Sequence, residues 1–281
     1  MLPDIISVYL AKLQNGSQIS RKSFQNLGND AFGCVRAEEL TKSGCSMAEM
    51  ATVTKYAFIS DIHSNLEALE AVLDDTGKTD VYCLGDIVGY GASPNEVVAL
   101  LRERGATCIV GNHDFAVLSG KVNEFNARAV QAVTWTISVL SEENRLFLAG
   151  LPRNRTATLG GRKVFMTHGS PEDNLWEYVF PATHSDLLGY YLEKLGVQVI
   201  ALGHTHVPFI WVDKAGTVFN PGSVGQPRAG DRRASYALLK VNADGVAVEH
   251  RNVEYDVDKA ARKIIEVGLP ESLARRLFTG G

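Results

Sequence analysis

From Lys55 onward, short apolar runs alternate with longer amphipathic stretches, and this alternation constrains the fold more than any other feature of the sequence. Each run has the length of a strand and ends near a glycine or an acidic residue, whereas the intervening stretches have helical spacing. The alternation predicts βαβ units in a layered α/β domain. Strands are expected at residues 56–60, 81–84, 107–110, 163–167 and 197–202.

Helices are expected between these strands, at residues 65–75, 93–104 and 125–140. The second of these opens with Ser93 and Pro94, a capping residue followed by a proline at the first helical position. After His204 the pattern changes to closely spaced strands, at residues 207–212, 217–220, 234–241 and 246–253. These strands predict a meander that forms a second sheet, followed by a terminal helix at residues 256–267.

Residues 1–52 lack this alternation and carry scattered Gln, Asn, Ser and Lys residues. Three of the four methionines, Met1, Met47 and Met50, lie in or close to this part of the chain. We interpret residues 1–52 as an N-terminal extension, either flexible or the product of a start codon assigned too early. Residues 53–281 are then the functional domain, and they include the C-terminal helix.

Composition excludes several classes of protein. The 28 Lys and Arg residues are outnumbered by 32 Asp and Glu, and the net charge of −4 argues against binding to a nucleic-acid backbone or an anionic membrane. Every apolar stretch is shorter than the roughly 18 residues of a membrane span, and no export signal is evident. The four cysteines, Cys34, Cys45, Cys83 and Cys108, form no C-x-x-C pair and predict reduced thiols in the cytoplasm.

Histidines are concentrated at the expected strand ends. Five of the seven lie there beside Asp, Asn or Gly, and they are His63, His113, His168, His204 and His206. A single histidine at a strand end is usually an ordinary loop residue, but five in the same structural position need a common cause. The carboxyl ends of parallel strands converge on one crevice, so these side chains are expected to share a site.

The neighbouring residues complete a set of metal ligands. Asp61 and His63 are two apart in a segment expected to be extended, so their side chains would leave on one face, as would those of His204 and His206. Adding Asp86, Asn112 and His168 gives seven nitrogen and oxygen ligands without a thiolate, a set suited to Mn²⁺, Fe, Zn²⁺ or Ni²⁺. Seven ligands exceed one coordination sphere, and the Asp86 carboxylate is the natural bridge between two ions.

Five short motifs, taken in order, resemble the calcineurin-like metallophosphoesterase superfamily. They are Asp61-Ile62-His63, Gly85-Asp86, Gly111-Asn112-His113-Asp114, Thr167-His168-Gly169 and Gly203-His204-Thr205-His206. The flanking sequences at residues 85–91 and 220–225 are similar to the small bacterial and archaeal phosphodiesterase branch of that superfamily.

The resemblance implies a four-layer α/β/β/α metallophosphoesterase-like sandwich with two divalent metal ions. One ion would be held by Asp61, His63, Asp86 and His206, and the other by Asp86, Asn112, His168 and His204. Mn²⁺ is favoured, with Fe, Zn²⁺ or Ni²⁺ as alternatives. A hydroxide bridging the two ions would attack phosphorus in line.

The resemblance also places His113 on the substrate side, because Asn112 is its immediate neighbour and points to the metal. His113 would donate a hydrogen bond to a phosphoryl oxygen or a proton to the leaving alkoxide. Asp114 would orient the His113 imidazole, the alternative being a helix cap without a catalytic part.

Two departures from the wider superfamily concern the substrate. Phosphoprotein phosphatases and dinucleoside-tetraphosphate hydrolases of this superfamily carry Asp-Arg where this chain has Gly89-Tyr90, which disfavours their substrates here. Tyr90 is expected to form an aromatic wall of the pocket. Arg228 is a candidate for the missing phosphate grip, the alternative being a solvated loop arginine.

These features predict a metal-dependent phosphodiesterase that hydrolyses small phosphodiesters or nucleotides. The alternatives are a phosphomonoesterase or phosphoprotein phosphatase of the same superfamily, and a non-catalytic binding scaffold such as the retromer subunit with this fold. Scaffolding relatives are free to lose ligands, whereas every ligand position is filled here. The expected partner is therefore a small phosphoester substrate, and the oligomeric state is left open.

Overall fold

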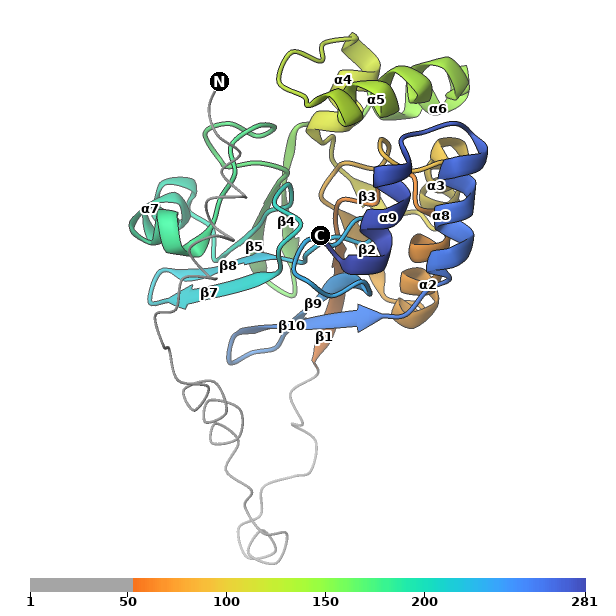
Figure 1. The fold of residues 1–281 in the computed structure, drawn as a ribbon. Coiled ribbons are helices and arrows are strands. Elements are labelled where there is room, and N and C mark those ends of the chain that lie inside the picture. Colours follow the sequence, from red (N-terminus) through yellow and green to blue (C-terminus); the bar gives the residue numbers. More distant parts are fainter. Residues whose placement is uncertain (1–52) are drawn as a thin grey trace, which may run out of the picture. The chain divides into compact units, whose positions relative to one another are not determined.

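The computed structural model describes residues 53–281, which form two stacked β-sheets covered by helices (Figure 1). The expectations for residues 1–52, including Cys34 and Cys45, lie outside the described residues. Within the described part of the chain, no helix is long and apolar enough to cross a membrane. Cys83 and Cys108 are buried free thiols, as expected for those two cysteines.

The first sheet is mixed, with a parallel part that carries the start of the domain. Its strands in spatial order are β10 (Val246–Val253), β9 (Ala234–Val241), β1 (Thr54–Ile59), β2 (Asp80–Cys83) and β3 (Thr107–Cys108). The β1, β2 and β3 strands run parallel, whereas β9 is antiparallel to both β1 and β10.

The second sheet is also mixed. Its strands in spatial order are β4 (Asn154–Leu159), β5 (Arg162–Thr167), β6 (Val199–Ala201), β8 (Gly216–Asn220) and β7 (Phe209–Asp213). The three central strands β5, β6 and β8 are parallel, and the two edge strands are antiparallel to their neighbours.

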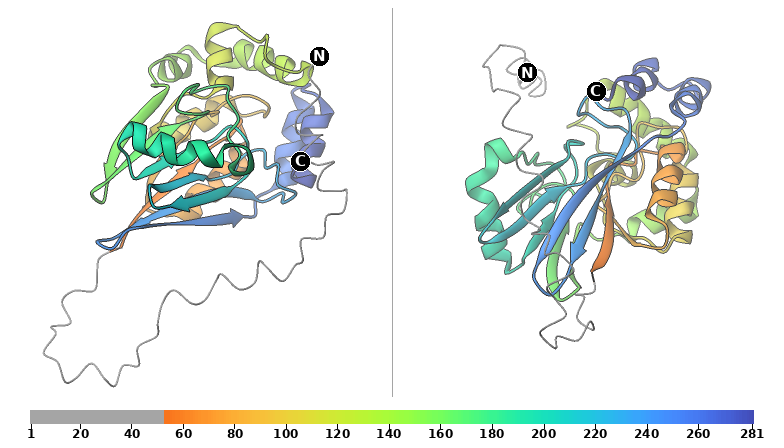
Figure 2. Two further views of the ribbon diagram at one scale, coloured as in Figure 1. Left: turned by 90° about the vertical axis from the view of Figure 1, so that its left-hand side faces the viewer. Right: turned by 90° about the horizontal axis from the view of Figure 1, so that it is seen from below.

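Apolar side chains from both sheets form a common core between them. Phe58 of the first sheet meets Phe219 of the second edge to face, with ring centroids 5.2 Å apart. Such an arrangement adds a favourable quadrupole interaction to the burial of two large rings. This interface makes the two sheets adjacent layers, as the right-hand view of Figure 2 shows.

Helices cover the two outer faces. On the first sheet lie α2 (Leu66–Thr76), α3 (Pro94–Glu103), α4 (Asn112–Ser119), α5 (Ala127–Val139) and α6 (Glu142–Ala149), with α8 (Val257–Glu266) and α9 (Glu271–Thr279) packed beside them. On the second sheet lies α7 (Pro181–Leu195). The predicted four-layer α/β/β/α sandwich is therefore confirmed.

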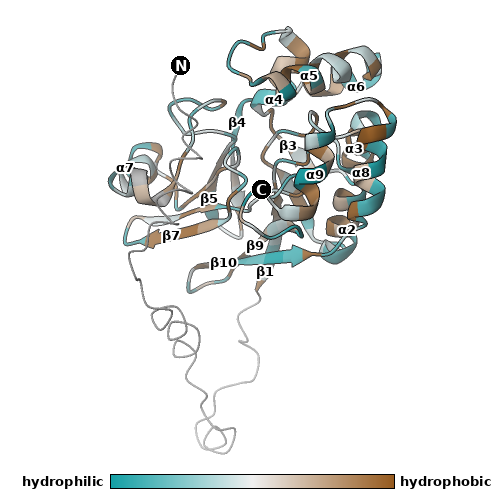
Figure 3. Ribbon diagram, viewed as in Figure 1, coloured by the Kyte–Doolittle hydropathy of each residue, from teal (hydrophilic) through white to brown (hydrophobic). Residues whose placement is uncertain are grey.

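Local sequence signals account for the helix starts. The Asn65 side chain accepts a hydrogen bond from the backbone N–H of Ala68 at the start of α2, and Asn126 caps α5 in the same way. Pro94 begins α3 where it was predicted. The amphipathic α8 turns its buried residues inward, and Figure 3 shows its hydrophilic residues on the side facing the viewer.

Two expectations about the second half were wrong. The strands after His204 do not form one meander, because the β7–β8 hairpin joins the second sheet whereas the β9–β10 hairpin returns to the first, beside β1. The helix at residues 257–266 is not terminal, since α9 follows it. Four further elements were not predicted, namely β4, α4, α6 and α7. The β4 strand is a mostly exposed edge strand without apolar alternation, and α4 and α6 are only 8 residues long.

Candidate metal centre

The seven predicted ligands converge where the strands end. Asp61 follows β1, Asp86 follows β2, and His168 directly follows β5. Asn112 begins α4 just after β3, and His204 and His206 lie in the loop after β6. All seven are buried, with at most 5% of any of them exposed. The structure thus brings together side chains that are up to 145 positions apart, from Asp61 to His206.

Potential ligand atoms form three overlapping groups, and the atoms of each group lie within 4.8 Å of one another. They are Asp61, His63 and His206, then His63, Asp86 and His113, and finally Asp86, His168 and His204. The middle group links the outer two, because it shares His63 with the first and Asp86 with the last. The Asp86 carboxylate therefore lies between the two outer groups.

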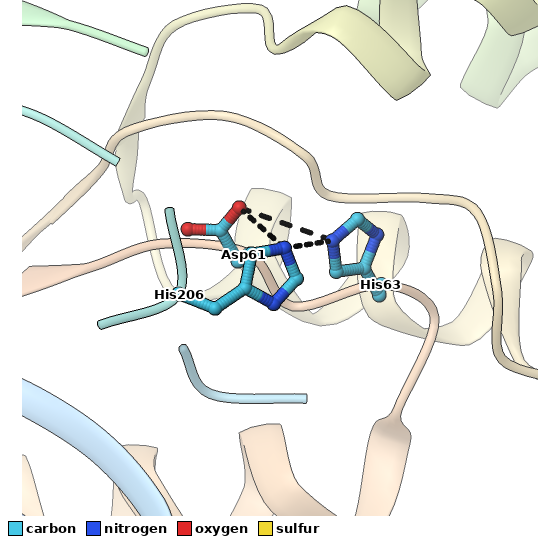
Figure 4. Close-up of side chains that lie close together, drawn as sticks. All are labelled: Asp61, His63 and His206. Carbon is cyan, nitrogen blue, oxygen red and sulfur yellow. Dashed lines mark hydrogen bonds and ion pairs between the residues drawn. The ribbon is translucent and has the colours of Figure 1, made fainter. Parts of the chain in front are cut away.

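Asp61, His63 and His206 form the group shown in Figure 4. The Asp61 Oδ1 lies 3.3 Å from the Nε2 of His206 and 3.8 Å from that of His63. Both carboxylate oxygens of Asp61 are buried without a hydrogen-bond donor. A buried carboxylate without a donor is costly, so this group has the chemistry of a cation site.

The outward-facing nitrogens of the imidazoles are held by backbone carbonyls. The Nδ1 atoms of His63, His168 and His206 lie 3.3, 2.9 and 2.6 Å from the carbonyl oxygens of Val88, Leu84 and Gln226. Because a carbonyl oxygen only accepts, each Nδ1 carries the proton, which leaves Nε2 as the ligand atom. For His204 the pattern is reversed, since its Nε2 donates to the Trp176 carbonyl at 3.1 Å.

These proton positions create a conflict that a metal ion resolves. The Nε2 atoms of His63 and His206 lie 3.2 Å apart, and in neutral rings both would direct lone pairs into the same space. A cation between them converts this repulsion into coordination. The residues present therefore fit a divalent metal with nitrogen and oxygen ligands.

The Asp86 carboxylate has one oxygen fixed and one directed at the histidines. Its Oδ1 accepts the backbone N–H of His113 at 2.8 Å. Its Oδ2 lies 3.6 Å from the Nε2 of His63 and 3.4 Å from that of His168. Asn112 is placed beside the second group, with Oδ1 3.0 Å from the Nε2 of His168.

The backbone of the ligand loops is not extended, contrary to the expectation for residues 61–63 and 204–206. Asp61, His63, Asp86, His204 and His206 all have positive φ angles, between 49° and 68°. Non-glycine residues rarely adopt this left-handed conformation, which is characteristic of strained functional sites. With this backbone, Asp61 and His63 share a group, whereas His204 and His206 belong to different ones.

Burial shifts the protonation of the ligands. It raises the pKa of Asp61 to about 7 and lowers the pKa of His63, His204 and His206 well below the usual histidine value. Burial also lowers the pKa of His168, but the charge and hydrogen bond of the Asp86 carboxylate, together with Asp61 and the Leu84 carbonyl, raise it to about 9. A bound cation would oppose the shifts at Asp61 and His168, since it favours a deprotonated carboxylate and a neutral imidazole.

His113 lies beside the ligands but has a different environment. Its Nδ1 is buried without a hydrogen-bond partner, and burial lowers its pKa to about 4. A Cβ atom on Gly89, whose φ is +98°, would lie 2.6 Å from that Nδ1. The lack of a side chain at Gly89 therefore leaves room for the His113 ring.

The expected contact between Asp114 and the His113 imidazole is not made. Both Asp114 oxygens accept backbone N–H groups at 2.9 Å, one from Val88 and the other from Gly111 at the start of α4. Asp114 therefore acts as the helix cap of the alternative interpretation, and it also ties α4 to the loop after β2.

A pocket of about 170 Å³ opens beside the metal ligands. Both predicted substrate-binding residues line it: Tyr90 is packed against His113, with ring centroids 4.4 Å apart, and the Arg228 guanidinium lies 6.0 Å from the Tyr90 ring centre. Five further lining residues were missed by sequence reasoning, and they are Glu124, Phe125, Asn126, Trp176 and Tyr178. All five lie in connecting loops, and no periodicity marks Glu124, Trp176 and Tyr178. Phe125 and Asn126 were expected in the helix at residues 125–140, but α5 begins only at Ala127.

Comparisons with known proteins identify the family of this chain. Residues 55–244 match the calcineurin-like phosphoesterase superfamily domain. An uncharacterized protein of Methanocaldococcus jannaschii, MJ0912, is 41% identical over 244 residues, which are 80% of this chain and 97% of that protein. Phosphodiesterase YfcE of Escherichia coli K12 is 29% identical over 203 residues, which are 66% of this chain and 86% of YfcE.

A solved structure extends the likeness to the whole domain. The crystal structure of a metallophosphoesterase from Sphaerobacter thermophilus is 36% identical and superposes with a TM-score of 0.68, covering 82% of this chain and 100% of that one. The fold and the buried histidine and aspartate groups define a metal-binding hydrolase. The chain belongs to the calcineurin-like phosphoesterase superfamily.

Proposed function

We propose that this protein is a phosphodiesterase that uses two divalent metal ions, preferably Mn²⁺, to hydrolyse small phosphodiesters or nucleotides. The observation that carries the proposal is the series of overlapping buried ligand groups, in which His63 and Asp86 connect the outer two, with the His63 and His206 Nε2 atoms 3.2 Å apart. When bound, such ions lower the pKa of a coordinated water and neutralise phosphoryl oxygens.

The ligands divide between two ions according to the groups in which they lie. Asp61, His63 and His206 would hold one ion. Asn112, His168 and His204 would hold the other, with Asp86 shared by both. The backbone carbonyls that fix the imidazoles keep each ligand nitrogen directed at its ion.

Other residues of the pocket would act on the substrate. His113 lies beside Asp86 and lines the pocket, where an imidazole N–H can donate to a phosphoryl or leaving-group oxygen. Arg228 also lines the pocket, and its Nη2 donates to the Gln226 Oε1 at 2.9 Å. The rest of its planar fork can grip a phosphate oxygen through charge-assisted hydrogen bonds.

Two observations favour a diester. The pocket has aromatic walls that can accommodate a second organic group, and the similar E. coli protein YfcE is named a phosphodiesterase. Arg228 favours the second candidate, a phosphomonoesterase, because its guanidinium supplies the cation that a dianionic phosphate needs and that Gly89-Tyr90 lacks.

Side-by-side kinetics with Mn²⁺ separate the two candidates. We expect a higher kcat/KM for bis(p-nitrophenyl) phosphate than for p-nitrophenyl phosphate, with phosphorylated peptides as poor substrates. A preference of tenfold or more for the monoester would exclude the diesterase and leave the metal-dependent phosphoesterase in place.

Metal analysis tests the number of ions. We expect two Mn²⁺ ions per chain at saturation and a lower content in Asp86→Ala, because that variant loses the shared ligand. A content of one ion per chain that is unchanged in Asp86→Ala would refute the two-metal arrangement.

A further inference from the structure

We propose that Phe125, Trp176 and Tyr178 form a subsite that binds one ester group of the substrate as a flat, uncharged ring, the shape and charge of a nucleobase. This inference rests on the proposed phosphoesterase function and names the substrate class of the same site. All three residues line the pocket beside the metal ligands.

The three rings extend from the reacting centre in two rows, which together form the aromatic wall of the pocket. Phe125 packs edge to face on His113 with ring centroids 4.6 Å apart, and Trp176 packs on Phe125 at 5.5 Å. Tyr178 stacks on the ligand His204 at 3.9 Å, with an interplanar angle of 19°. A phosphate held by the metals and His113 would therefore direct an ester group along this wall.

In the loop after β5, hydrogen bonds fix the backbone of Trp176. The Asp173 Oδ1 accepts the backbone N–H groups of Leu175 and Trp176 at 3.1 and 3.2 Å. The Trp176 carbonyl accepts the Nε2–H of His204 at 3.1 Å. Because backbone groups on both sides of the ring are fixed, binding a flat group here costs little loop ordering.

Exposed aromatic surface in such a wall suits stacking. Tyr178 is 43% exposed, and Trp176 is only partly buried. Nucleic-acid bases stack on aromatic side chains of this kind with little dependence on their identity. An alkyl group would cover the same surface without the stacking geometry.

The charge of Glu124 at the edge of the pocket further restricts the class of ester group that can bind. Glu124 lines the pocket next to Phe125, and it is exposed. Its carboxylate repels an ester group that carries a further anionic charge and can accept a hydrogen bond from an exocyclic amine. The subsite is therefore built for a neutral ring rather than for a chain of additional phosphates.

Ligand binding to the full-length, Mn²⁺-loaded protein tests the subsite without relying on turnover. Adenosine 5′-monophosphate and ribose 5-phosphate share the phosphate and the sugar but differ by the base. We expect calorimetry to show adenosine monophosphate binding about tenfold more tightly, the scale of one base–aromatic stacking contact. Trp176→Leu, which keeps an apolar side chain but removes the ring, should abolish this difference while leaving the affinity for ribose 5-phosphate within about twofold.

Two further variants keep the test decisive. Phe125→Leu should reduce the difference in affinity between adenosine monophosphate and ribose 5-phosphate. It serves as the test variant if Trp176→Leu folds poorly. Trp211→Phe on β7, outside the pocket, is the matched control and should preserve the difference.

Equal affinities for the two phosphates, or a difference that survives both leucine variants, would overturn the subsite. Failure of the proposed function gives a different result, in which the loaded protein hydrolyses no phosphoester while the ring-dependent difference in binding persists.

Discussion

His206 donates its Nδ1–H to the backbone carbonyl of Gln226 across 2.6 Å, so a metal ligand on one loop is oriented by the main chain of another. The Gln226 side chain serves a different purpose, because its Oε1 accepts hydrogen bonds from Arg228 at 2.9 Å and from Arg276 of α9 at 3.2 Å. One residue thus connects the metal site, the candidate phosphate grip and the C-terminal helix.

Because the backbone and the side chain of Gln226 have different partners, we expect Gln226→Leu to affect substrate binding but not metal binding. The backbone carbonyl remains for His206, so the metal content should be unchanged. Arg228 loses the acceptor that holds its Nη2, and we expect KM to rise several-fold with a smaller change in kcat. Gln198→Leu is the control, since its carboxamide accepts the backbone N–H of Lys163, outside the site, and should leave KM unchanged. Loss of metal from Gln226→Leu would show that the side chain supports His206 after all.

His113 and His204 are expected to differ although both lie among the ligand groups. His113→Ala should keep its metal ions and lose turnover by about 10²-fold, the usual scale for a lost proton donor or oxyanion donor. His204→Ala should lose metal, because its imidazole belongs to the group with Asp86 and His168. Metal content and kcat measured on the same samples decide between the roles.

His250 on β10 provides the control for these two variants, because its Nε2 donates to the Asn220 carbonyl outside the ligand groups. Its replacement by alanine should change neither the metal content nor kcat. Metal loss from His113→Ala with the rate retained would reverse the two assignments.

Gly89→Ala should disturb His113 directly. The added Cβ would lie 2.6 Å from the His113 Nδ1, so the ring must shift, and a displacement of this kind can lower kcat by about tenfold or more. Gly161→Ala is a matched control, because Gly161 also has a positive φ, +82°, but an added Cβ there meets nothing within 4 Å. Both variants should lose stability of about 1 kcal/mol from backbone strain, and only Gly89→Ala should lose activity. Equal activities in the two variants would show that His113 tolerates the displacement.

Local sequence could predict the ligands but not the walls of the pocket. Asp86 and His168 were predictable because glycine beside a polar residue at a strand end marks a loop that leaves a sheet at its carboxyl edge. Trp176 and Phe125 lie in loops whose path depends on tertiary packing, so no spacing along the chain connects them. The left-handed backbone of Asp61 and His63 was also hidden, since non-glycine residues give no sign of it.

In the fold, too, local elements were predictable from the sequence, whereas contacts between distant segments were not. The parallel strands near Asp61 and Asp86 were predicted because apolar runs alternate with amphipathic helices. The return of β9 to the side of β1 was missed, because strand order depends on which apolar faces meet in three dimensions. The pairing of Phe58 with Phe219 between the sheets is likewise a contact that no local pattern specifies.

Metal binding should depend on pH because protons compete for the ligands. Burial raises the pKa of Asp61 to about 7, and the Asp86 charge raises that of His168 to about 9 against the effect of burial. Both groups must lose a proton to bind a metal, so the affinity for Mn²⁺ should increase as the pH rises through this range. Asp61 also makes the metal-free fold less stable as the pH rises from about 4 to 7, because the folded state then holds a proton that the unfolded state has lost.

Thermal unfolding with and without Mn²⁺ measures this competition. The increase in Tm on adding Mn²⁺ should be larger at pH 8 than at pH 6, because a ligand that binds only the folded state stabilises it by an amount that grows with the logarithm of its affinity. Asp61→Asn removes the titrating carboxylate and should reduce both the increase and its dependence on pH. An equal increase at the two pH values in the unaltered protein would mean that the buried ligands are already deprotonated at pH 6, and that neither Asp61 nor His168 competes with the metal for a proton.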